Sequence, residues 1–141
     1  MITLGKLIES TSIPASLVRA VVRQAGGWSS FKEMARDVAN HGADGGFHGF
    51  IYYSDTEPFA RRNREAIAEY AEQMASDIGE GGAVELVQGF NCFRNGKPSS
   101  AEVGRALYGR AKEEDEHNVL NALAWFALEE VSRAYADMLE R

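Results

Sequence analysis

Residues 115–140 read DEHNVLNALAWFALEEVSRAYADMLE, and no other segment constrains the architecture as strongly. Apolar residues recur in this segment every three or four positions, which is the period of an α-helix. These apolar residues occupy more than one side of the helix. The residues are Val119, Leu120, Leu123, Trp125, Phe126, Leu128, Val131, Tyr135 and Met138. A helix with such a wide apolar stripe is covered by several neighbours. The sequence therefore predicts a central helix with further helices around it.

Helical spacing also predicts two helices in the first third of the chain. Pro14 is well placed in the first turn of one of them, because the N–H groups of that turn have no intrahelical partner. The glycines at residues 26–27 are expected to end this helix. The next helix is expected to start near Ser30, whose spacing from Glu33 fits a capping box, and to stop at residues 41–42.

Three more helices are expected between this pair and the central helix. The first opens at residues 54–58 and ends at the glycines of residues 79–82, and its apolar face consists of Phe59, Ile67, Tyr70, Ala71, Met74 and Ile78. A short helix over residues 84–90 follows it. Ser99 and Glu102 form another capping box at the start of the next one. The fold class predicted is thus all-α, a compact bundle of about six helices.

Length and composition fit one helical domain over residues 1–141. The chain has 141 residues, of which 45% are hydrophobic, and its single cysteine, Cys92, has no partner for an intrachain disulfide. No apolar run approaches the ~20 residues that a membrane span needs, and residues 1–8 do not form a secretory leader. We therefore expect a protein of a reducing cytoplasm without a membrane segment.

Residues 40–56 interrupt the helical pattern and read NHGADGGFHGFIYYSDT. Four glycines in eight positions disfavour a helix, because each costs about 1 kcal/mol relative to alanine. We expect a glycine- and aromatic-rich loop here. The aromatic and β-branched residues at its end leave two alternatives open, which are a very short strand near residues 49–53 and a buried helical turn.

The only histidine cluster with the residue types of a metal site lies in this loop. His41, Asp44, His48 and Asp55 are residue types that bind zinc, but their spacing matches no zinc motif. We therefore expect local hydrogen bonds, with no metal and no cofactor. No nucleophile motif is present either, so we predict no catalytic residue.

The net charge of −6 lies entirely in the second half of the chain. Residues 1–70 carry eight acidic and eight basic side chains, whereas residues 71–141 carry thirteen and seven. This balance argues against direct binding to nucleic acid, which needs clustered basic charge. It suits a basic protein partner, although many acidic proteins carry such a charge without one.

Residues 41–56, HGADGGFHGFIYYSDT, form the most distinctive motif, with Phe59, residues 62–64 and residues 90–92 after it. Over residues 28–95 the chain resembles a family of small proteins of unknown function that phages, prophages and plasmids encode. The resemblance implies an accessory protein of a mobile element that acts in the bacterial cytoplasm. Such proteins often inhibit host defence, including CRISPR and restriction systems.

The leading hypothesis is a non-enzymatic, anti-CRISPR-type inhibitor that covers the nucleic-acid-binding surface of a host defence protein. Two groups of residues are expected to bind this partner. The loop group comprises Asp44, Phe47, His48, Tyr52, Tyr53 and Asp55. The helical group comprises the carboxylates of Glu113, Glu114, Asp115, Glu116, Glu129 and Glu130.

Two alternatives stay open beside this hypothesis. One is a small metal-dependent enzyme built on His41, Asp44 and His48, with Asp55 as a further ligand. The other is a structural or regulatory phage protein that associates with itself, for example as a homodimer.

Overall fold

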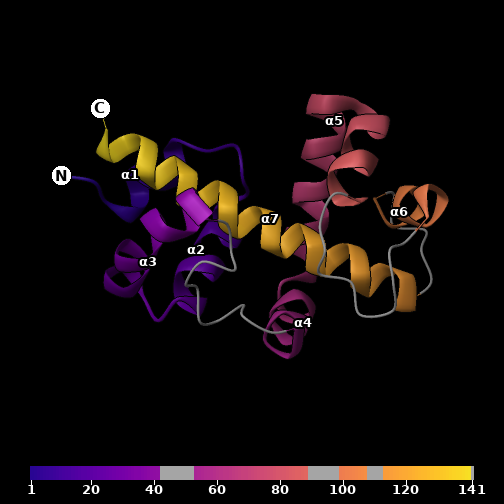
Figure 1. Ribbon diagram of the computed structural model, residues 1–141, viewed down its shortest axis with the longest axis horizontal. Coiled ribbons are helices and arrows are strands. Elements are labelled where there is room, and N and C mark those ends of the chain that lie inside the picture. The colour runs from indigo at the N-terminus through magenta and orange to yellow at the C-terminus, as the bar shows by residue number, and fades with distance from the viewer. Residues whose placement is uncertain (42–52, 89–98, 108–112, 141) are drawn as a thin grey trace. The chain divides into compact units, whose positions relative to one another are not determined.

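The computed structural model describes residues 1–41, 53–88, 99–107 and 113–140, and all regular structure in these ranges is α-helical (Figure 1). The helices in the described ranges are α1 (Leu4–Glu9), α2 (Ala15–Gln24), α3 (Trp28–His41), α4 (Tyr53–Arg62), α5 (Arg64–Gln88), α6 (Ser100–Leu107) and α7 (Glu113–Leu139). The predicted all-α class is therefore confirmed. Of the short strand proposed near residues 49–53, Tyr53 is helical, and the other positions lie outside the described residues.

The internal contacts divide the chain into two units. The terminal unit consists of Met1–Thr56 and Trp125–Arg141, and it contains α1, α2, α3 and the C-terminal part of α7. The middle unit consists of Glu57–Ala124, and it contains α5, α6, most of α4 and the N-terminal part of α7. That residues 1–141 form a single domain stays a prediction.

Helix α1 was not predicted, and it exists because of a cap and one core contact. The hydroxyl of Thr3 accepts a hydrogen bond from the backbone N–H of Lys6 at 3.2 Å, which satisfies one free donor of the first turn. Leu7 is fully buried. Six residues are too few for helical periodicity to be visible in the sequence, so the tertiary contact of Leu7 stabilises this helix.

Helix α2 ends at the two glycines, as predicted. Gly26 has a φ of 101° and Gly27 a φ of 112°, a conformation that other residues rarely adopt. The N–H of Gly27 donates to the carbonyl of Val22 at 3.0 Å, which satisfies an otherwise unpaired group at the end of the helix. The turn is short, and α2 packs against α3.

The next helix starts near Ser30, as predicted, but its first residue is Trp28, so the capping role predicted for Ser30 is wrong. The carbonyl of Gly27 already accepts the N–H of Phe31 at 2.9 Å, so the glycine turn itself starts the helix. Ser30 thus lies inside the first turn, where it cannot form the capping box expected with Glu33.

An aromatic cluster joins α3 to the C-terminal part of α7 in the core of the terminal unit. The rings of Trp28 and Phe31 stack with centroids 5.8 Å apart. The Tyr135 ring meets both edge-on, at 5.7 and 5.8 Å respectively. Figure 1 shows this part of α7 lying beside α1, α2 and α3. Other buried side chains of this core are Leu7, Leu17, Val18, Val21, Val38, Leu128 and Val131.

The middle unit corrects the prediction of one unbroken helix from residue 54 to residue 78. The chain breaks at Asn63, which separates α4 from α5. Both the backbone N–H and the side-chain amide of Asn63 donate to the carbonyl of Phe59, at 3.1 and 2.9 Å. The Asn63 carbonyl in turn accepts from Ile67 at 2.9 Å. The side-chain amide thus shares the Phe59 carbonyl with the backbone N–H at the position where the two helices meet.

A glycine also divides α5, close to the end predicted at residues 79–82. Gly79 has φ 79° and ψ 161°, a combination that is almost restricted to glycine. Of the apolar face predicted for this region, Phe59, Ile67, Tyr70, Ala71 and Met74 are buried. Ile78 is the exception, with 51% exposure, because it directly precedes the kink where the helix changes direction. Helix α5 packs against α6.

The long C-terminal helix confirms the segment on which the fold was argued. It was predicted over residues 115–140, and α7 covers Glu113–Leu139. Five consecutive residues, 120–124, are all buried, so this part of the helix is enclosed on every side. No helix in the described ranges is both long enough and apolar enough to span a membrane.

Candidate functional site

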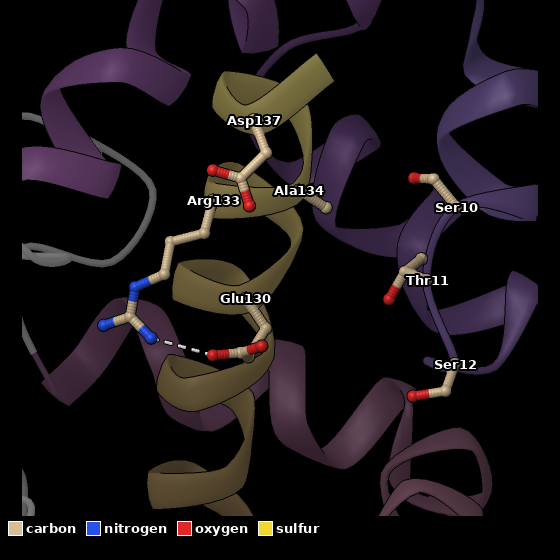
Figure 2. A pocket seen from close by; sticks show the side chains of 7 residues that line it. All are labelled: Ser10, Thr11, Ser12, Glu130, Arg133, Ala134 and Asp137. Atoms are coloured by element: carbon tan, nitrogen blue, oxygen red, sulfur yellow. Dashed lines mark hydrogen bonds and ion pairs between the residues drawn. The ribbon is translucent and has the colours of Figure 1, made fainter. Parts of the chain in front are cut away.

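A polar pocket of about 310 Å³ lies in the terminal unit, between the segment that joins α1 to α2 and one face of α7 (Figure 2). Its lining consists of Ser10, Thr11, Ser12, Glu130, Arg133, Ala134 and Asp137. We refer to this site as the polar pocket. Every residue that lines it carries a hydroxyl or a charge, apart from one alanine.

One wall of the polar pocket is formed by three consecutive hydroxyl residues. The Ser10 hydroxyl donates to the carbonyl of Leu7 at 2.8 Å, so it ends α1. The Thr11 hydroxyl oxygen accepts from the N–H of Ile13 at 3.2 Å, which leaves its own hydrogen available as a donor. Ile13 and the following Pro14 are buried and anchor the segment. The wall therefore presents hydroxyl groups from a fixed backbone.

The facing wall is a single stripe of α7. Glu130, Arg133, Ala134 and Asp137 are spaced i, i+3, i+4 and i+7, so helical geometry places them on the same face. Ala134 lies in the middle of this stripe and projects only a methyl group. The longer side chains before and after it are thereby left with room between them.

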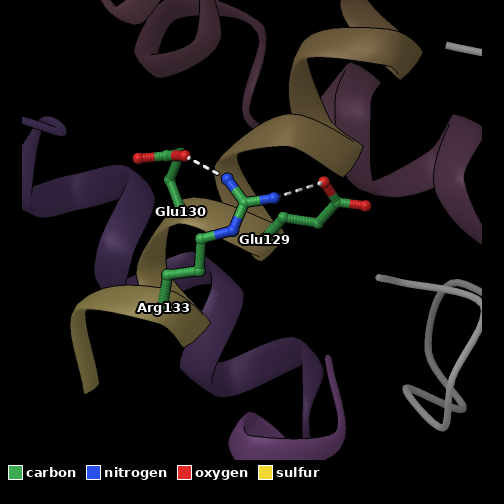
Figure 3. A network of polar contacts seen from close by, with 3 residues as sticks. All are labelled: Glu129, Glu130 and Arg133. Atoms are coloured by element: carbon green, nitrogen blue, oxygen red, sulfur yellow. Dashed lines mark hydrogen bonds and ion pairs between the residues drawn. The ribbon is translucent and has the colours of Figure 1, made fainter. Parts of the chain in front are cut away.

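Arg133 is held by two carboxylates within the helix (Figure 3). Its Nη1 lies 2.8 Å from Oε1 of Glu130, and its Nη2 lies 3.7 Å from Oε2 of Glu129. The Arg133 and Glu130 side chains are 50% and 38% exposed. Ion pairs at such exposure contribute only about 0.2–1 kcal/mol to stability, so this contact is formed but easily broken.

Asp137 has no ion pair among the described residues. In Figure 2 the Arg133 side chain extends toward Glu130, while Asp137 lies at the other end of the stripe. This orientation follows a helical preference, because an acid three or four residues before a base pairs better than one after it. Asp137 is therefore an exposed carboxylate at one end of the pocket.

A second, smaller pocket of about 110 Å³ also lies in the terminal unit. It is lined by Arg36, Asn40, Ala136, Leu139 and Glu140. Leu139 is 37% exposed. This pocket is much smaller than the polar pocket, and its lining brings together one basic and one acidic side chain.

The carboxylates predicted to bind a partner are divided between the two units. Glu130 lines the polar pocket, and Glu129 contacts the same arginine. The other members of the helical group lie in the first turn of α7, within the middle unit, and are Glu113, Glu114, Asp115 and Glu116. Of the six predicted carboxylates, Glu130 alone is among the residues that line the pocket, and Glu129 is connected to it through Arg133.

Most of the predicted loop group lies outside the described residues, namely Asp44, Phe47, His48 and Tyr52. Tyr53 and Asp55 belong to the first turn of α4, and His41 is the last residue of α3. Within the described ranges, no group of three His, Cys, Asp or Glu residues is arranged to hold a metal ion. Partner binding by the loop, and the alternative of a metal site built on it, stay predictions.

Five residues that line the polar pocket were not predicted from the sequence, namely Ser10, Thr11, Ser12, Arg133 and Asp137. The i, i+3, i+7 spacing of Glu130, Arg133 and Asp137 was visible and predicts one polar helix face. The hydroxyl triplet before Pro14 was also visible. What the sequence did not reveal is that these two segments, far apart in the chain, face each other.

Fold and site together define an all-helical protein with a polar, acid-lined pocket beside its C-terminal helix. The chain belongs to the family described as "Domain of unknown function (DUF7222)", whose model matches residues 11–141. It matches no curated protein and no solved structure.

Proposed function

We propose that this protein binds a basic segment of another protein, and that an arginine or lysine of that segment enters the polar pocket. The observation that carries this proposal is an ion pair between two residues that line the pocket, because Nη1 of Arg133 lies 2.8 Å from Oε1 of Glu130. In this contact, the Glu130 carboxylate accepts a hydrogen bond from a guanidinium, as it would from the arginine of a partner. Asp137 supplies a second carboxylate in the same pocket.

The hydroxyl wall suits a polypeptide ligand. The free hydroxyl hydrogen of Thr11 can donate to a backbone carbonyl, while the opposite wall accepts hydrogen bonds from a cationic side chain. A basic peptide offers both groups, with a carbonyl at each residue and donors on its side chains. The net charge of −6 favours encounter with such a partner from a distance.

We further propose that the partner is a host defence protein and that binding covers a surface used for nucleic acid. Arginine and lysine side chains on such surfaces bind phosphate, and carboxylates accept the same donors. The support for the biological setting is the resemblance of residues 28–95 to proteins of phages and plasmids. The protein would then act as an anti-CRISPR-type inhibitor, with Phe47, Tyr52 and Tyr53 as additional contacts.

The test combines protection of phage with direct binding. Bacteria with an active CRISPR or restriction system are infected while they express the wild-type protein, the double variant E130Q/D137N, or the control E33Q. Glu33 is exposed on α3 and does not line the pocket. We expect wild type and E33Q to restore plaque formation and the double variant to lose most of this effect.

Binding of the purified proteins to the purified defence complexes is measured in parallel by interferometry. We expect the same ranking of variants and an affinity that falls with rising salt. Equal protection by the double variant would contradict a role for the pocket. Absence of protection and of binding across the panel of defence systems would contradict the inhibitor function.

A further inference from the structure

We infer that Arg133 covers the Glu130 carboxylate of the polar pocket in the free protein and leaves it when a partner's arginine enters. This inference rests on the proposed function and adds its mechanism. In the free protein, Arg133 occupies the carboxylate that the partner needs. In the complex, one guanidinium replaces another on Glu130, and the number of ion pairs at that residue is unchanged.

The geometry makes this exchange easy. Arg133 is half exposed, so its guanidinium can return to water without a large loss of packing. Its second contact, to Glu129, is long at 3.7 Å, and the Glu129 side chain is only 17% exposed. When Glu130 is taken by the partner, Arg133 can shorten its contact with Glu129 and so remain paired.

Asp137 gives the partner a first contact. Its carboxylate is exposed and has no ion pair within the described part of the chain. An incoming arginine can therefore bind Asp137 before any existing contact breaks, and Glu130 afterwards. Ala134, between the two carboxylates on the helix face, does not obstruct this path.

The exchange has a measurable consequence. The ion pair between Arg133 and Glu130 must break before the ligand binds Glu130, so its free energy is subtracted from the binding free energy of a basic ligand. Exposed ion pairs of this type correspond to a factor of about two to five in an equilibrium constant. Removal of the Arg133 charge should strengthen binding by about this factor. The effect should depend on Glu130, because that is the carboxylate which Arg133 covers.

The experiment measures fluorescence anisotropy with a labelled arginine-rich peptide and with its citrulline analogue, which has the same shape without charge. The proteins are wild type, R133Q, R19Q, E130Q and E130Q/R133Q. R19Q is the matched control, because Arg19 is exposed on α2, does not line the pocket, and its loss changes the net charge equally. We expect R133Q to bind the arginine peptide about two to five times more tightly than R19Q does.

When Glu130 is already replaced by glutamine, adding R133Q should raise the affinity for the arginine peptide by no more than R19Q raises it in the wild-type protein. The NMR signal of the Arg133 Nε–Hε group should also shift when the wild-type protein binds the peptide. If the wild-type protein binds the arginine peptide but R133Q binds it no more tightly than R19Q does, Arg133 does not compete for Glu130. The inference is then overturned, and the proposed function stands. If R133Q binds more weakly, Arg133 itself contacts the ligand and the inference is wrong.

Failure of the proposed function gives a different result. In that case neither wild type nor R133Q prefers the arginine peptide to its citrulline analogue, although circular dichroism shows both proteins folded. That outcome contradicts the proposed function, and it also contradicts the exchange of arginines, which depends on that function.

Discussion

The face of α7 that lines the polar pocket and the buried stretch of the same helix at residues 120–124 hold polar side chains in opposite environments. In the terminal unit, Glu130, Arg133 and Asp137 line a pocket and remain largely hydrated. In the middle unit, Asn121 is 1% exposed, and neither its Nδ2 nor its Oδ1 has a hydrogen-bond partner in the described structure. The first set can bind a ligand at little cost in stability, whereas the buried amide lowers stability. Mutations should therefore separate binding from folding along one helix.

The largest effect is expected from Phe31→Ala, which removes a ring from the aromatic cluster that joins α3 to α7. Phe31 is fully buried and contacts the rings of Trp28 and Tyr135. Loss of such a side chain costs about 3–5 kcal/mol of the free energy of unfolding, as measured in urea. Peptide binding should also weaken, since Tyr135 belongs to the helix that carries the charged wall. A loss below ~1 kcal/mol would contradict this role, and Phe31→Leu serves as the milder control.

The second change, Asn121→Leu, tests the other stretch of the helix and should have the opposite sign. The leucine has a similar volume and removes two buried polar atoms that lack partners. We expect the free energy of unfolding to rise by about 1–3 kcal/mol in urea titrations. A lower midpoint than wild type would show that the amide has an energetically important partner in the folded protein.

How far the sequence predicted these features depends on how local their causes are. The end of α2 was predictable, because the φ values at Gly26 and Gly27 follow from glycine chemistry alone. The bounds of α7 followed from its wide apolar stripe. Helix α1 was not predictable, because its stability depends on the burial of Leu7 in a core formed by distant residues. The break at Asn63 was hidden within an apolar spacing that continues across it.

The candidate site shows the same limit. Glu130 was identified because a count of charges along the helix points to it. The hydroxyl wall was missed, because Thr11 acquires its role only when α1 and α7 pack in the same unit. Asp137 was missed since nothing local distinguishes it from other surface acids, and its relation to Ala134 and Arg133 becomes informative only beside that wall.

A third change tests the middle unit through its backbone. Gly79→Ala places a side chain where φ is 79°, and we expect a loss of about 1–2 kcal/mol in the free energy of unfolding. Gly81→Ala is the matched control, because that glycine has no left-handed φ and open space around it. There, alanine should raise stability by about 0.5–1 kcal/mol, as it does in ordinary helices. Equal changes in the free energy of unfolding at the two positions would contradict the left-handed backbone conformation at Gly79.

The smallest effect, and the sharpest separation of binding from folding, is expected for Asp137→Asn. Asp137 lies in the last turn of α7, which contains no basic residue, so its negative charge faces the negative end of the helix dipole. Its removal should therefore raise the free energy of unfolding by about 0.3–1 kcal/mol, a gain that shrinks as salt screens the charge. The same change removes the carboxylate that an incoming arginine meets first, so binding of the arginine peptide should weaken. A gain in stability together with a loss of affinity would indicate that this acid serves binding at the expense of folding. If stability and affinity both fell, Asp137 would instead have a structural role in the terminal unit, and the pocket would need another point of entry.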